Sequence, residues 1–284
     1  MTSAVSTDAT VPLTPDDVAE PGPEARPAGP ATTCAVVAQR TIRKFVRTPQ
    51  LMVIGTIQSA MFLFIFRYAF GGAIDTGPVP YVQFLVPGYL VSGVLFSGAG
   101  AAAGVAEDIE HGFSDRLRSL PVARTALLAG RSVADTALLT WGLVVATAIA
   151  FAVGFRIDGS VPSAVAAWGL CVVYGAAFTW VFIAIGTFAG SAQAAAGMSM
   201  LVFPLTALSS AYVPVATMPG WMQPIAEHQP ITAMTNAVRS LVLGDPSTAG
   251  LGHGTGHWVL VSLAWCAGLV VVFAPLSVSR YRRS

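Results

Sequence analysis

The feature that most constrains this chain is a long stretch without charge. Between residues 159 and 226 the sequence contains no Asp, Glu, Lys or Arg. A soluble domain carries roughly 25% charged residues, whereas this chain has 10% charged and 54% hydrophobic residues. Because about 20 apolar residues cross a bilayer, the stretch is long enough for more than one crossing. The sequence therefore predicts an integral membrane protein. The net charge of +1 argues against a nucleic-acid partner, which needs a clustered basic surface.

Six apolar segments are candidate transmembrane helices, which makes the predicted fold all-α. The uncharged stretch is divided at residues 190–197, its least hydrophobic part before the Pro-rich end. The predicted spans are 51–70, 84–106, 136–155, 163–188, 197–212 and 257–277. A helix of about 20 residues, at 1.5 Å per residue, matches the ~30 Å hydrocarbon layer. Residues 49–284 are therefore predicted to form one six-span domain in contact with membrane lipids.

Two segments precede the first span. Residues 1–34 are rich in Pro, Ala, Thr and acids, without apolar periodicity, and predict a disordered cytoplasmic tail. Residues 35–48 predict an amphipathic helix that lies in the membrane interface and stops before Pro49. The basic face of this helix comprises Arg40, Arg43, Lys44 and Arg47.

The distribution of basic residues predicts the orientation in the membrane. With six spans, both termini lie on one side. Eleven basic residues then fall on that side: Arg40, Arg43, Lys44, Arg47, Arg116, Arg118, Arg124, Arg131, Arg280, Arg282 and Arg283. Three fall on the other: Arg67, Arg156 and Arg239. Because Lys and Arg collect on the cytoplasmic side, the sequence predicts both termini inside and residues 213–256 outside.

Motifs for catalysis are absent from the sequence. It has no GxxxxGK[ST] phosphate loop, no HExxH and no GxSxG. His253 and His257 are four residues apart, but glycines at 254 and 256 oppose a helix there, so no metal site is predicted. Asp135 is the one candidate buried acid, and Arg131 is expected to pair with it at i,i+4. The paired acids, Ser/Lys pair or His cluster that an intramembrane enzyme would need are absent from the predicted spans. A transporter of this sequence takes its energy from elsewhere or is a passive channel.

A charged loop between the second and third spans carries an apolar stripe. Phe113, Leu117 and Leu120 recur at i, i+4 and i+7, and Pro121 limits the helix that they predict. Such a ridge outside the membrane is suited to a groove on a soluble partner. The alternative is a helix that lies back on the inner leaflet.

A second unusual segment, 218–244, is too apolar for a free loop. Pro219, Pro224 and Pro230 divide it into two short helices, which we expect to dip into the outer leaflet as re-entrant half-helices between spans five and six. Trp221 suits the membrane interface.

Polar residues within the predicted spans could line a substrate path or form packing hydrogen bonds, and small residues there could pack within the chain or across a dimer. The polar candidates for a substrate path are Gln58, Thr206, Ser209 and Ser210, although packing hydrogen bonds explain them equally well. Gly93, Ser97, Gly100 and Gly104 share one helix face and predict close helix packing, either within the chain or across a dimer.

The two unusual segments resemble those of a known family. The loop reads Glu-x-x-Glu-x-Gly…Arg-Leu-Arg-x-x-Pro, and the outer segment reads Pro-Gly-Trp-Met-Gln-Pro…Gln-Pro-Ile-Thr…Asn-Ala-Val-Arg. Over residues 35–283 the chain resembles type-2 ABC exporter permeases, in particular the daunorubicin/doxorubicin-resistance group. The resemblance implies a cell-membrane exporter with two permease copies, identical or homologous, and two separate ATP-binding subunits. ATP and Mg would be bound there, with no cofactor in this chain.

The resemblance also implies roles for particular residues and a class of substrate. A coupling helix would seat in the ATP-binding subunit through Glu110, Gly112, Arg116, Leu117 and Pro121, together with Phe113 and Leu120 of the stripe. The re-entrant segment would include Pro219, Trp221, Pro224, Pro230 and Arg239. The substrate would be a hydrophobic drug, antibiotic or natural product, with a lipid or glycolipid as the alternative.

Overall fold

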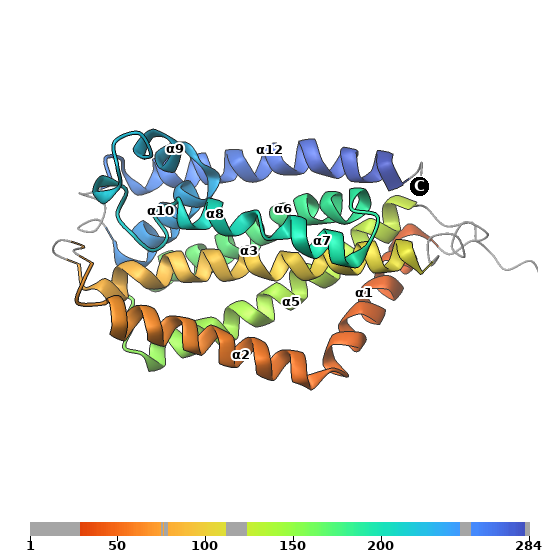
Figure 1. Ribbon diagram of the computed structural model, residues 1–284, viewed down its shortest axis with the longest axis horizontal. Coiled ribbons are helices and arrows are strands. Elements are labelled where there is room, and N and C mark those ends of the chain that lie inside the picture. Colours follow the sequence, from red (N-terminus) through yellow and green to blue (C-terminus); the bar gives the residue numbers. More distant parts are fainter. Residues whose placement is uncertain (1–28, 75, 77–78, 112–123, 245–250, 282–284) are drawn as a thin grey trace, which may run out of the picture.

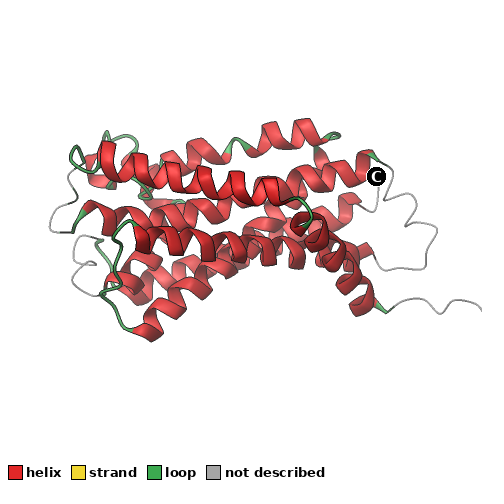
Figure 2. Ribbon diagram, turned by 90° about the horizontal axis from the view of Figure 1, so that it is seen from below, coloured by secondary structure: helices red, strands yellow, loops and turns green. Residues whose placement is uncertain are grey.

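The computed structural model describes residues 29–74, 76, 79–111, 124–244 and 251–281 as an α-helical bundle without strands in these ranges (Figure 2). The helices are α1 (Pro30–Val46), α2 (Pro49–Phe64), the π-helix η2 (Ile65–Phe70), α3 (Tyr81–Glu110), α5 (Arg124–Ala152), α6 (Val161–Phe188), α7 (Ala192–Ser199), α8 (Val202–Ala207), the 3-10 turn η3 (Val215–Thr217), α9 (Gln223–His228), α10 (Pro230–Leu243) and α12 (Thr255–Tyr281). This composition confirms the predicted all-α class.

The long helices lie side by side, with α2 and α12 at opposite edges of the view in Figure 1. α1 and the C-terminal end of α12 lie at one end of the bundle, which we call the α1 end. α9 and α10 lie at the opposite end, the α10 end. Among the described residues, five helices are long and apolar enough to cross a membrane: Met52–Phe70, Tyr81–Glu110, Ala126–Ala152, Val161–Phe188 and Thr255–Arg280. These correspond to five of the six expected spans.

The expected fifth span, 197–212, differs in the structure. Two short helices, α7 and α8, replace the single helix, with an interruption at Met200 and Leu201. Pro204 lies in the first turn of α8. Proline lacks the N–H that a continuous helix would donate to the carbonyl of Met200, and its ring collides with that carbonyl. The helical segment also starts earlier than expected, because the Ser191 hydroxyl accepts a hydrogen bond from the Ala194 N–H at 3.2 Å and caps α7.

The core of the bundle is formed by α3 and α6. In their most apolar windows 61% of the residues are buried, against 6% for α2 and 11% for α12. Close approach of α3 and α6 depends on glycine: a Cβ at Gly98 would lie 2.1 Å from the Phe182 ring, and one at Gly186 would lie 2.5 Å from the Ala102 carbonyl. The exposed apolar surfaces of α2 and α12 suit contact with lipid or with another membrane helix.

α1 packs against the bundle at the N-terminal end of α5. A Cβ at Gly130 of α5 would lie 2.7 Å from the Cys34 carbonyl of α1, so the two backbones touch. α1 begins at Pro30, earlier than the expected start at residue 35, and proline is well suited to the first turn of a helix.

Candidate functional site

Charged side chains from three helices meet at the α1 end. We call this set the charge network: Arg40 and Lys44 of α1, Glu107 and Asp108 of α3, and Arg131 and Asp135 of α5. Its contacts are Lys44 Nζ to Glu107 Oε2 (3.1 Å), Arg40 Nη1 to Asp108 Oδ1 (3.5 Å), Arg131 Nη1 to Asp108 Oδ2 (3.4 Å) and Arg131 Nε to Asp135 Oδ2 (2.9 Å). The predicted Arg131–Asp135 pair is confirmed.

The Lys44–Glu107 pair and the Arg131–Asp135 pair of the charge network differ in their exposure. The Lys44 side chain is 71% exposed, and such a surface pair contributes at most about 1 kcal/mol. Arg131 and Asp135 are only 14% and 9% exposed, so solvent screens them less. Asp108 contacts Arg40 and Arg131 at once. The network thus ties α1 to the adjoining ends of α3 and α5.

A glycine of α3 leaves room for the buried Arg131 side chain of the network. A Cβ at Gly104 of α3 would lie 2.1 Å from Arg131 Nη2, whereas one at Gly100 would meet nothing within 4 Å. The Arg131 side chain therefore crosses α3 over Gly104, and its Nη2 donates a long 3.5 Å hydrogen bond to the Gly100 carbonyl.

Glu110 is the one predicted coupling residue that the structure describes. Its Oε2 accepts a 3.2 Å hydrogen bond from the Ala192 N–H, at the N-terminus of α7. A carboxylate there satisfies a backbone donor and interacts favourably with the helix dipole. Glu110 thus joins the end of α3 to the start of the broken helix pair. The other coupling candidates lie outside the described residues: Gly112, Phe113, Arg116, Leu117, Leu120 and Pro121.

The α10 end contains the two short helices that were predicted between 218 and 244. Pro224 and Pro230 lie in the first turns of α9 and α10, where proline is tolerated. Pro219 begins the preceding turn through a 2.8 Å hydrogen bond from the Met222 N–H to its carbonyl. Trp221 is 72% exposed, as a residue at a membrane interface would be.

Arg239 of α10 is almost completely buried, with 2% of its surface exposed. Its Nη2 donates 2.9 Å hydrogen bonds to the carbonyls of Phe84 and Ser210, and its Nη1 donates to Asn236 Oδ1 at 3.2 Å. No Asp or Glu in the described part of the chain pairs with this guanidinium. Carbonyl dipoles and the Phe84 ring compensate the buried charge. Arg239 therefore fastens α10 to α3 and to the segment after α8.

Three of the four substrate-path candidates lie together beside Arg239. The hydroxyls of buried Thr206, Ser209 and Ser210 donate to Val202 O (2.8 Å), Thr206 O (2.6 Å) and Asn236 Oδ1 (2.9 Å). Each of these hydroxyls therefore has an acceptor within the chain, and their place on a substrate path stays a prediction. Gln58 lies apart, exposed on α2.

Sequence reasoning missed two polar partners in this region. Asn236 joins Ser210 to Arg239, and the Thr232 hydroxyl accepts a 3.1 Å hydrogen bond from the Ser210 N–H. Thr232, Asn236 and Arg239 recur at i, i+4 and i+7 of α10, so a search for polar periodicity would have found this face.

A small-residue face of α3 is open on the outside of the bundle. Gly93, Ser97 and Gly100 are exposed, and a Cβ at either glycine would meet nothing within 4 Å. Phe96 of α3 and Phe203 of α8 lie next to this face, with ring centroids 6.4 Å apart. Within the described chain, no helix covers the positions of these two glycines.

Comparison with known proteins identifies the family. The family model described as ABC-2 type transporter matches residues 32–243. The "Daunorubicin resistance ABC transporter permease protein DrrB1" of Streptomyces coeruleorubidus is 33% identical over 262 residues, 90% of this chain and 89% of that protein. The "Probable doxorubicin resistance ABC transporter permease protein DrrC" of Mycobacterium tuberculosis (strain H37Rv) is 27% identical over 214 residues, 74% of this chain and 72% of that protein. The chain therefore belongs to the ABC-2 type transporter family and is a multi-pass protein of the cell membrane.

Proposed function

We propose that this chain is the permease subunit of an ATP-driven exporter that moves a hydrophobic drug, antibiotic or natural product out of the cell. The observation that carries the proposal is the charge network at the α1 end. It holds the helix ends that flank residues 112–123, the segment expected to meet the ATP-binding subunit. The family match over residues 32–243 and the names of the relatives support the same role.

In this proposal the α1 end faces the cytoplasm. The eleven-to-three distribution of basic residues supports this orientation. The broken pair α7–α8 would provide the fifth crossing in chain order, which returns the chain to the α10 end before α9 and α10. Both termini would then lie inside.

ATP hydrolysis is assigned to a separate subunit because the sequence has no phosphate loop. Glu110 would transmit movement of that subunit to α7 through its hydrogen bond to Ala192. The buried hydrogen bonds of Arg239 would keep α10, α3 and the segment after α8 together during this movement.

The open face of α3 is the proposed contact with a second permease copy. Its small residues allow close approach of another helix, and the apolar side chains of Phe96 and Phe203 border it. The substrate would pass between the two copies.

The experiment that tests the proposed function is transport into inside-out membrane vesicles. Vesicles with this chain and the ATP-binding subunit that co-purifies with it should accumulate daunorubicin only when ATP is present. Vesicles with either subunit alone should not. Equal uptake by the chain alone without ATP would instead support a passive channel. ATP-dependent movement of a fluorescent phospholipid, without drug uptake, would support the lipid alternative.

A further inference from the structure

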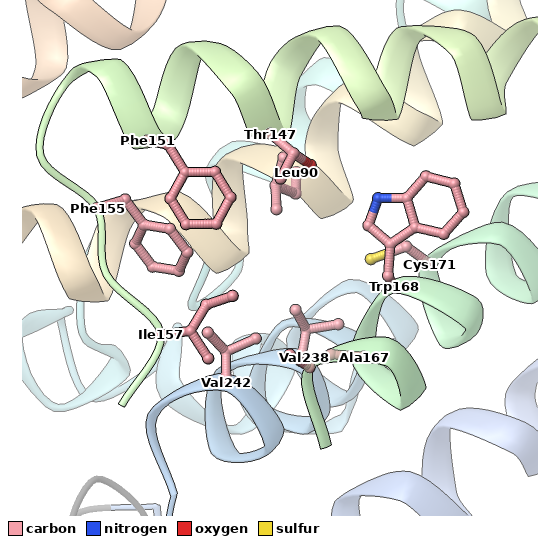
Figure 3. A pocket seen from close by; sticks show the side chains of 11 residues that line it. Leu90, Thr147, Phe151, Phe155, Ile157, Ala167, Trp168, Cys171, Val238 and Val242 are labelled. Carbon is pink, nitrogen blue, oxygen red and sulfur yellow. The ribbon is translucent and has the colours of Figure 1, made fainter. Parts of the chain in front are cut away.

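A small cavity lies between α5, α6 and α10, away from the contacts of Arg239 (Figure 3). Its volume is about 40 Å³. Phe151, Phe155 and Ile157 line one side, with Val242 next to Ile157, and Trp168 and Cys171 line the other. A 2.8 Å hydrogen bond from the Gly159 N–H to the Val242 carbonyl joins the segment after α5 to the end of α10. The cavity therefore lies near the α10 end of the bundle.

The lining of the cavity favours hydrocarbon over water. Almost all of its side chains are apolar, and the hydroxyl of Thr147 already donates to the Leu143 carbonyl at 2.7 Å. A buried water needs two to four polar partners, which this lining does not offer. The enclosed space holds one or two methylene groups, because a cavity of about 150 Å³ holds one benzene molecule. Phe151 and Ile157 are each 39% exposed, so the apolar lining continues onto the surface that faces lipid.

The cationic side chain of Arg156 lies beside this cavity. Arg156 is exposed and lies in the sequence between Phe155 and Ile157, which both line the cavity. Its Nη1 donates hydrogen bonds to the carbonyls of Phe155 (2.9 Å) and Phe151 (3.4 Å), so the guanidinium is held at the end of α5. Within the described part of the chain no carboxylate pairs with Arg156. The Arg156 side chain is exposed, and a guanidinium suits a phosphate group.

We propose that this cavity and Arg156 form a binding site for one phospholipid of the leaflet at the α10 end, with part of one acyl chain against the apolar lining of the cavity and the phosphate on Arg156. A single lipid satisfies both features, because it joins a hydrocarbon chain to a phosphate located at the membrane interface. The site goes beyond the proposed export function, since the cavity opens to the lipid-facing side of α5 and α6.

The bound chain would act on α10. Val238 and Val242 of α10 line the cavity, and Arg239 lies on the same helix with its side chain bonded to α3. Filling the cavity adds dispersion contacts that an empty space lacks. The lipid therefore contacts α10 on a different face from the one that makes its polar contacts.

Photo-crosslinking in reconstituted vesicles tests the site. The probe is phosphatidylglycerol with a diazirine in one acyl chain, in vesicles of phosphatidylethanolamine and phosphatidylglycerol. Cys171 is 1% exposed, so bulk lipid does not reach it except through the cavity. Mass spectrometry should find adducts at Cys171 or Trp168, measured relative to adducts at Val271, which is 71% exposed on α12.

Matched variants separate the site from general lipid contact. Ala164→Phe fills the cavity and should lower the Cys171-to-Val271 adduct ratio about tenfold. Val165→Phe, on the neighbouring position that is 66% exposed, should leave the ratio unchanged. Arg156→Gln should lower it about threefold, as expected for an exposed charge pair, and Arg156→Lys should restore most of it.

Phe151→Ala enlarges the cavity instead of filling it. Its result can be read even if Ala164→Phe does not reach the membrane. The enlarged cavity should raise the adduct ratio. Labelling of Val271 without labelling of Cys171 or Trp168 in the wild-type protein would overturn the proposal. An unchanged ratio in Ala164→Phe and Phe151→Ala would also overturn it.

Discussion

The guanidinium of Arg239 lies 3.7 Å from the centre of the Phe84 ring and also donates a 2.9 Å hydrogen bond to the carbonyl of the same residue. Both contacts join α10 to α3, across 155 positions in the sequence. A buried guanidinium is tolerated only while its N–H donors have acceptors. The charge of Arg239 therefore requires α10 and α3 to keep their relative position.

Arg239→Lys should therefore destabilise the protein although it keeps the charge. Three nitrogens of the guanidinium donate hydrogen bonds, Nε and Nη2 to Phe84 and Ser210 and Nη1 to Asn236, whereas lysine has a single nitrogen. We expect a loss of about 2–3 kcal/mol of stability, measured as a lower melting temperature of the purified protein in detergent. Arg43→Lys, at an exposed position of α1, is the control and should have no effect. An unchanged melting temperature for Arg239→Lys would contradict the role given to the hydrogen bonds of the guanidinium.

Gly104→Ala should disturb the charge network, whereas Gly100→Ala should not. The added methyl group at 104 would overlap Arg131 and push it away from Asp108 and Asp135, while position 100 is open. We expect α1 of the Gly104 variant to become more sensitive to trypsin at Arg40 and Arg43, with ATP-dependent transport reduced several-fold. In the single subunit, Gly100→Ala should be neutral or stabilising by up to about 1 kcal/mol, since alanine favours helix more than glycine does. Because Gly100 lies on the proposed contact with the second copy, this control is read by protease sensitivity and not by transport. Equal protease sensitivity of the two variants would show that Arg131 does not hold α1.

Several elements of this structure could be predicted because their causes are local. The amphipathic period of α1, the apolar length of the five long helices and the i,i+4 spacing of Arg131 and Asp135 are visible within short windows of sequence. The proline-bounded helices α9 and α10 are local in the same sense.

Other elements depend on partners far away in the sequence. Nothing near Arg239 indicates that its acceptors are Phe84 and Ser210, and nothing near Asp108 indicates Arg40. The break between α7 and α8 has a local cause in Pro204, but proline is also found within the long helix α3, at Pro87. Whether a proline interrupts a membrane helix depends on neighbours that supply or replace the lost hydrogen bond.

The proposed orientation predicts the accessibility of two serines outside the described residues. In a background without native cysteines, Ser247→Cys should react with a membrane-impermeant maleimide added to intact cells, because 213–256 is expected outside. Ser284→Cys should react only after the cells are permeabilised. The reverse pattern, or labelling of both positions in intact cells, would rule out the six-span arrangement with both termini inside.

The isolated chain should neither bind nor hydrolyse ATP. The sequence contains no phosphate loop to cradle the nucleotide. Equilibrium binding of radiolabelled ATP to a preparation free of other polypeptides checks this expectation, and saturable binding there would contradict the assignment of ATP to a separate subunit.

The most direct measurement is the effect of Leu117→Asp on coupling. Leu117 is the middle residue of the stripe expected to seat in the ATP-binding subunit. A charge in an apolar groove should weaken the complex by at least about 4 kcal/mol, which corresponds to about a thousandfold in affinity. The account predicts normal membrane abundance with loss of both subunit pull-down and ATP-dependent daunorubicin uptake, while the volume-conserving Leu117→Met retains them. Full pull-down and uptake by Leu117→Asp would contradict the claim that this chain is driven through that loop by a separate ATP-binding subunit.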